Sequence, residues 1–151
     1  MTYIEKITYQ TGSFLQIMQF AIKNAYRLTF LTNGSKVENP SLKGNSTILE
    51  VQEASAIKEL VKNQSFTSKE TISYFSSNEG LSKKDLNTLS KLLKKRDYII
   101  SYYFIDNASQ LAMENALIYE SKIKELDEYI NEATNLNVSI SKSIEKLYKA
   151  F

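Results

Sequence analysis

Non-polar residues in the C-terminal part of the chain recur at alternating steps of four and three residues, from Ala112 to Phe151. Such a pattern repeats on average every 3.5 residues or so and keeps one apolar stripe on one side of an α-helix with about 3.6 residues per turn. This C-terminal seam predicts a long helix that packs against other helices. Its main positions are Tyr119, Ile123, Leu126, Ile130, Asn137, Ile140, Ile144, Leu147 and Phe151.

A second seam of the same kind occupies the N-terminal part of the chain. It begins beside Thr2 and Glu5, whose hydroxyl and carboxylate have the spacing of a capping box. No charged residue occurs between Ile7 and Ile22, so this helix is expected to be buried on most sides, either within one molecule or between subunits. The main positions of this N-terminal seam are Ile4, Ile7, Phe14, Met18, Ala21 and Leu28.

The turn-forming residues are few, with four Gly and one Pro in 151 residues. A β-sandwich of this length needs many more, so the sequence predicts an all-α fold. We expect an elongated helical hairpin or bundle with long N- and C-terminal heptad helices and a middle region of shorter helices. As a single helix, the last forty or so residues would extend about 60 Å, which is longer than a compact domain of this size.

The length favours a single domain, which turn signals divide into four parts. An N-terminal helix is expected over 1–32 and a polar loop over 33–46. Short helices follow over 47–80, and a long C-terminal helical region covers 81–151, with a kink near 106–110 where the seam loses phase. Inside these parts, hydroxyl and carboxylate residues three positions apart predict three helix starts. These pairs are Thr47 with Glu50, Thr67 with Glu70, and Ser82 with Asp85.

Two local points allow alternatives. Residues 98–105 are rich in aromatic and β-branched side chains, which favour a strand, although helical spacing on both sides favours a helix. Asn137 is the one polar residue at an a position of the C-terminal seam. It either pairs with another polar side chain and fixes the helix register, or marks a helix break beside Asn135. The uncharged residues Tyr129 and Tyr148 flank this seam, which favours a multi-helix bundle over an isolated two-stranded coil.

The chain has no Cys and no His, so the usual ligands of zinc and iron–sulfur clusters and the usual general base of hydrolases are missing. We therefore expect no catalytic residue, no metal site and no cofactor, and a protein that is not an enzyme. The longest apolar run, Tyr98 to Ile105, is too short for a bilayer, which takes about 20 residues to span. No secretory signal is recognised, so the protein is expected to be soluble. It is extracellular if exported by a signal-peptide-independent route and otherwise cytoplasmic.

A run of basic residues follows the expected turn at Gly80 and loosely fits the second helix of a helix-turn-helix. The plainer interpretation is the solvated face of an amphipathic helix. A formal net charge of +2 adds no strong field, so nucleic acid is not the expected partner. The residues of this candidate nucleic-acid face are Lys83, Lys84, Lys91, Lys94, Lys95 and Arg96.

The segment from Tyr119 to Ile123, followed by Glu125, Tyr129, Asn131 and Phe151, resembles the last helix of type III secretion needle subunits. The outline of the chain is also similar to that of the translocator-filament subunits of those systems. In that family the N- and C-terminal heptad helices pair in a hairpin and stack into a hollow helical filament. The resemblance thus implies an exported, self-assembling protein.

These observations predict a non-enzymatic protein that forms homo-oligomers or helical filaments by burying its two seams against neighbouring subunits. The alternative is a small helical inhibitor or adaptor, of the kind that phages and plasmids encode, whose partner is a heterologous protein. A third interpretation is a helix-turn-helix regulator that binds DNA.

Overall fold

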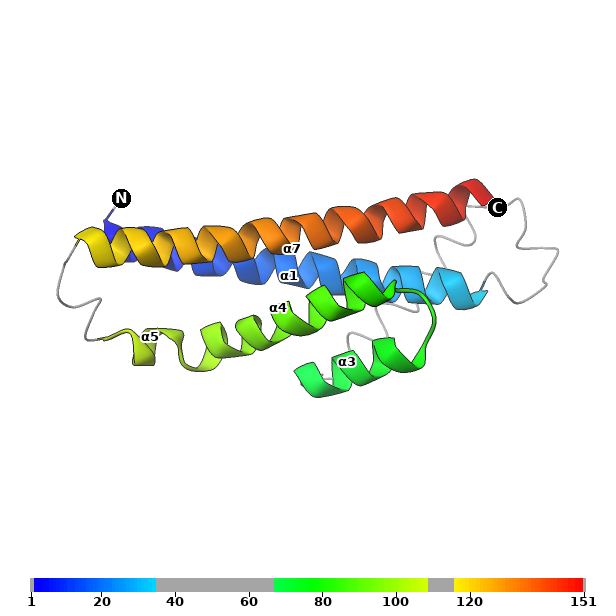
Figure 1. Cartoon of the computed structure of the whole chain (residues 1–151), viewed down its shortest axis with the longest axis horizontal. Coiled ribbons are helices and arrows are strands. Elements are labelled where there is room, and N and C mark those ends of the chain that lie inside the picture. Colours follow the sequence, from blue (N-terminus) through cyan, green and yellow to red (C-terminus); the bar gives the residue numbers. More distant parts are fainter. Residues whose placement is uncertain (1, 35–66, 109–115, 151) are drawn as a thin grey trace.

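A computed structural model describes residues 2–34, 67–108 and 116–150 of the chain. These residues are almost entirely helical, and no strand occurs among them, so the all-α prediction is confirmed. The helices are α1 (Tyr3–Gly34), α3 (Ser68–Ser77), α4 (Lys83–Ser101), α5 (Tyr103–Asp106) and α7 (Ala116–Ala150), as Figure 1 shows.

The two terminal helices, α1 and α7, lie side by side and run in the same direction (Figure 1). At one end the ring of Tyr3 stacks on that of Tyr119, with 4.9 Å between centroids. At the other end the guanidinium of Arg27 donates a hydrogen bond of 2.7 Å to the hydroxyl of Tyr148. The terminal helices therefore form a parallel pair. This differs from the hairpin pairing of terminal helices that the resemblance to filament subunits implies.

The antiparallel hairpin of this bundle is formed by α4 and α7 (Figure 1). Helix α4 ends at Ser101, and the next residue, Tyr102, is its C-cap. The short helix α5 follows directly. The region 81–151 thus reverses its direction before α7 begins, which is a larger change than the expected kink near 106–110. Residues 98–105 are helical apart from Tyr102, so the strand alternative was wrong.

The hydrophobic core lies where the two seams face each other. Phe14 and Met18 of α1 are fully buried, as are Leu126 and Ile140 of α7. Helix α4 adds a third side to this core with Leu89, Leu92 and Leu93. Because each helix covers the apolar stripe of the others, the described part of one chain forms a closed three-helix core.

The helix starts follow the expected capping residues. The amide of Thr2 donates to the Glu5 carboxylate over 3.0 Å, and the Glu5 amide donates to the Thr2 hydroxyl over 3.1 Å, which is a complete capping box. Thr67 and Ser82 are the N-caps of α3 and α4 and accept from the amides three residues on. The expected loop over 33–46 and the start at Thr47 lie outside the described residues, apart from Asn33 and Gly34.

The turn between α3 and α4 packs directly on the backbone of α1. A Cβ atom built on Gly80 would lie 2.8 Å from Cα of Thr29, so no other side chain fits at this position. The side chain of Asn33 donates to the carbonyl oxygen of Glu79 over 3.3 Å and joins the same turn to α1. Nearby, the ring of Tyr26 lies 4.8 Å from that of Phe75. The short helix α3 is held against the bundle by these contacts.

Candidate interaction surface

Most of the residues predicted to form an assembly interface lie inside the bundle. One chain covers most of both seams, because α1 and α7 pack side by side, so a neighbouring subunit is not needed to bury them. Ile4 is 45% exposed, and Phe151 lies outside the described residues. The buried members are Ile7, Phe14, Met18, Ala21, Leu28, Tyr119, Leu126, Ile140 and Ile144, and those partly buried are Ile123, Ile130, Asn137 and Leu147.

Asn137 pairs with a polar side chain of α1. The amide nitrogen of Asn24 donates a hydrogen bond of 2.7 Å to Oδ1 of Asn137, and both side chains are half-buried. Helix α7 continues through this position to Ala150, so the interpretation as a helix break was wrong. A polar pair within an apolar interface is lost if the helices slip, and it therefore fixes the register of α1 against α7.

A buried carboxylate links α4 to α7. Asp85 is 5% exposed, and the hydroxyl of Ser139 lies 3.0 Å from each of its carboxylate oxygens. The sequence indicated Asp85 only as the partner of Ser82 in a capping box and did not indicate the contact with α7. A signal was present, since Asp85 lies four residues before Leu89 on the apolar face of its helix.

Glu125 of α7 influences two tyrosines, Tyr129 of α7 and Tyr103 of α5. The hydroxyl of Tyr129 donates a hydrogen bond of 2.8 Å to this carboxylate, and burial followed by this contact raises the pKa of Tyr129 above its usual value. Burial, together with the charge of Glu125, raises the pKa of Tyr103 to about 12. Both phenols therefore stay protonated at neutral pH, and they serve as core residues with a polar tip.

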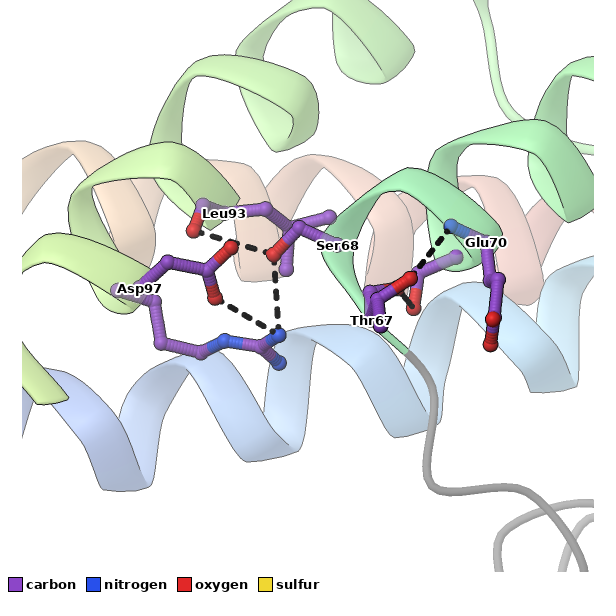
Figure 2. Close-up of polar contacts among 7 residues, drawn as sticks. Thr67, Ser68, Glu70, Leu93 and Asp97 are labelled. Atoms are coloured by element: carbon purple, nitrogen blue, oxygen red, sulfur yellow. Dashed lines mark hydrogen bonds and ion pairs between the residues drawn. The ribbon is translucent and has the colours of Figure 1, made fainter. Parts of the chain in front are cut away.

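The six basic residues of the candidate nucleic-acid face do not share one role. Lys91 forms an ion pair of 3.4 Å with Glu132, and the ammonium of Lys95 lies 5.1 Å from the centre of the Tyr129 ring. Arg96 donates to the hydroxyl of Ser68 and to Asp97; Figure 2 labels these two acceptor residues and draws the guanidinium between them without a label. The remaining three, Lys83, Lys84 and Lys94, are exposed.

A groove lies between α1 and α4 next to the start of α3. The hydroxyl of Ser68, the first residue of α3, bonds to the Leu93 carbonyl and to Arg96 (Figure 2), and Arg96 also lines the groove. The groove has a volume of about 230 Å³. Apolar side chains dominate its walls, with two cationic side chains among them. The lining residues are Leu15, Gln19, Ile22, Lys23, Arg96 and Ile100.

The outer faces of the helices also carry large apolar side chains. The densest group, which we call the outer apolar cluster, comprises Tyr98, Ile100, Tyr102 and Phe104, where α4 ends and α5 begins. Ile100 and Tyr102 are 64% and 59% exposed. The other exposed members are Ile4, Tyr9 and Phe20 on α1, and Leu117 and Val138 on α7.

In the part of the chain that the structure describes, no group of three or more acidic side chains is arranged to hold a metal ion. None of the described helices has the length and apolarity needed to cross a membrane. No family model, curated protein or solved structure matches the chain.

Proposed function

We propose that this protein is a non-enzymatic assembly protein that forms homo-oligomers through the outer faces of its helical bundle. The observation that carries the proposal is the outer apolar cluster, where four large apolar side chains lie exposed within residues 98–104. Large apolar side chains that gather on the surface of a soluble protein often mark interaction sites. Its burial in a contact stabilises the assembly by about 25 cal/mol per Å².

In this proposal the seams hold each subunit together, and the outer faces join the subunits. Opening the bundle to use the seams would expose Phe14, Met18 and Leu126, which are fully buried in one chain. A contact between outer faces leaves this core closed. Helical filaments form if such contacts repeat without closing into a ring. The resemblance of residues 119–123 to needle subunits supports an exported filament subunit as the specific form.

The test is the state of association of the purified chain. Sedimentation velocity over a wide concentration range should show oligomers, and electron microscopy of concentrated protein should show filaments if the contacts repeat. Replacing Ile100 by glutamate should weaken association, since a charge would enter the buried contact. Asn87→Glu is the matched control, because Asn87 is an exposed polar residue of the same helix. A wild-type protein that stays monomeric at every concentration refutes the proposal.

The groove between α1 and α4 supports a second function, that of an adaptor or inhibitor which binds a heterologous protein. Leu15, Ile22 and Ile100 offer an apolar floor, and Lys23 and Arg96 add positive charge. An amphipathic helix with acidic residues beside its apolar face has the matching chemistry. Co-purification from the source cells followed by size analysis separates the two functions. An adaptor gives a discrete complex with one foreign protein, whereas an assembly protein gives complexes of itself.

A further inference from the structure

Helix α1 presents to solvent a face that lies away from its buried seam. We call it the outer stripe, and its residues recur every three or four positions along the helix, so they share one face. All of them are exposed, with Tyr9 and Phe20 at 65% and 50%. The stripe consists of Glu5, Tyr9, Gly12, Gln16, Gln19, Phe20 and Lys23.

This stripe has an unusual composition for a solvent-facing helix. Between its two ends it carries no charge, because no charged residue occurs from Ile7 to Ile22. Exposed helix faces normally carry charged residues. The exposed face of α7 does so in the same molecule, with Glu120, Lys124 and Glu128. An uncharged exposed face with two large aromatic side chains is expected to be covered by another surface.

The middle of the stripe is open to close approach. Gly12 has no side chain, and beyond the adjoining backbone of its own helix no atom lies within 4 Å of the place that its Cβ would occupy. A neighbouring helix can therefore approach the backbone of α1 at this point, with Tyr9 before it and Phe20 after it. Glycine at such a site suits helix crossings in which two backbones come close.

We propose that the outer stripe binds the same stripe of a second copy, with the two α1 helices antiparallel about a twofold axis between Gly12 and Gln16. This inference rests on the proposed function and adds to it a second contact, separate from the outer apolar cluster. An antiparallel arrangement centred there places Glu5 of each copy opposite Lys23 of the other. It also brings Tyr9 of each copy beside Gln19 and Phe20 of the other.

Charge decides between the two directions. In a parallel arrangement Glu5 faces Glu5 and Lys23 faces Lys23, so like charges meet at both ends. In the antiparallel arrangement opposite charges meet at both ends, over a contact that extends about 27 Å at about 1.5 Å per residue. Such exposed ion pairs select orientation more than they add affinity. Because a twofold contact closes on itself, the outer apolar cluster remains available for a further contact in a filament.

The first test replaces Gly12 by arginine. This variant should fold, since the position is exposed and arginine favours a helix more than glycine does. It places a charged, bulky side chain at the centre of the contact, and the dissociation constant should rise by at least about a hundredfold. Asn131→Arg is the matched control, because it adds the same charge at an exposed position of α7.

The outcomes of sedimentation equilibrium separate the inference from the proposed function. Loss of association in Gly12→Arg alone, with circular dichroism unchanged, supports both. Equal association of wild type, Gly12→Arg and Asn131→Arg overturns the outer stripe as the contact and leaves the proposed function standing. A monomeric wild-type protein overturns both.

The second test determines the direction of the contact. The chain contains no cysteine, so single introduced cysteines report specific contacts. Mixing Glu5→Cys with Lys23→Cys under mild oxidation should give the mixed disulfide, because these positions face each other in the antiparallel dimer. The antiparallel arrangement would be overturned if disulfides formed only between identical variants. It would also be overturned if the mixture still associated but formed no disulfide.

Discussion

Replacing Gly80 by alanine would place a methyl group against the backbone of α1. The new Cβ would lie 2.8 Å from Cα, 2.9 Å from Oγ1 and 3.2 Å from the amide nitrogen of Thr29. Thr29 cannot easily move its hydroxyl away, because Oγ1 donates a hydrogen bond of 2.8 Å to the carbonyl oxygen of Ala25. The clash must therefore be relieved by moving the turn between α3 and α4 away from α1.

The expected cost follows from these distances. Overpacking of a tight contact typically costs about 1–3 kcal/mol, and two of the three atoms that the methyl group meets belong to backbone that is fixed in a helix. We expect Gly80→Ala to lower the free energy of unfolding by about 2 kcal/mol. For a chain of this length, this corresponds to a fall in Tm of about 4–8 °C.

Urea unfolding followed by circular dichroism measures this change. Gly12→Ala provides the control, because a methyl group there meets nothing within 4 Å beyond the adjoining backbone of its own helix, and alanine favours the helix. We expect the control to gain about 0.5–1 kcal/mol. A Gly80→Ala variant as stable as the wild-type protein would refute the close packing of this turn on Thr29.

Three further predictions concern buried polar groups. Asn24→Leu or Asn137→Leu alone should lower the free energy of unfolding by about 1–3 kcal/mol, because each leaves one side-chain amide without its partner. The double variant should recover most of this loss. Additive losses in a double-mutant cycle would contradict the pair. Ser139→Ala should cost about 1–3 kcal/mol in urea unfolding, since it removes the hydroxyl that binds the buried carboxylate of Asp85, and an unchanged midpoint would count against that contact. The pKa of Tyr103 is raised to about 12 by burial, so the stability that depends on its protonated form is complete below pH 10 and is lost between about pH 10 and 12. Burial also raises the pKa of Tyr26 to about 12 and raises that of Tyr129, so in an absorbance titration Tyr103→Phe should lower the amplitude of the late step by one phenol relative to wild type. An unchanged late amplitude would show that Tyr103 does not titrate there.

The sequence predicted those parts of the fold that depend on residues close together in the chain. A capping box joins residues three positions apart, and Thr2, Thr67 and Ser82 begin helices as their spacing predicted. The apolar seams likewise predicted which sides of the terminal helices are buried. Phe14 and Ile140, for instance, are fully buried.

The relative direction of the terminal helices was beyond such reasoning. An apolar seam offers the same stripe to a parallel or an antiparallel partner, so its period contains no information about direction. The contacts of Tyr3 with Tyr119 and of Arg27 with Tyr148 together show the direction, but each joins residues that are far apart in the sequence. The sequence also predicted only a kink between α4 and α7, where the chain reverses its direction. A shift in the apolar pattern indicates that a helix is interrupted, but it does not give the angle between the two parts.

The candidate surface was predicted only in part. The seams indicate what lies inside a bundle, and residues such as Tyr9 and Phe20 fall outside that pattern. The absence of charged residues between Ile7 and Ile22 indicated that this helix is widely buried. It was compatible with burial within one molecule and with burial between subunits. The structure shows that the outer side of this stretch is exposed in one chain, which the sequence alone did not reveal.

The parallel course of α1 and α7 has a mechanical consequence. The start of α1 and the end of α7 lie at opposite ends of the long axis (Figure 1). A pulling force applied between these two points would slide α1 along α7 and strain every layer of their contact together. In a hairpin with adjacent ends, the same force would peel the layers apart one after another. This bundle should therefore resist tension along its length better than a hairpin of the same helices would.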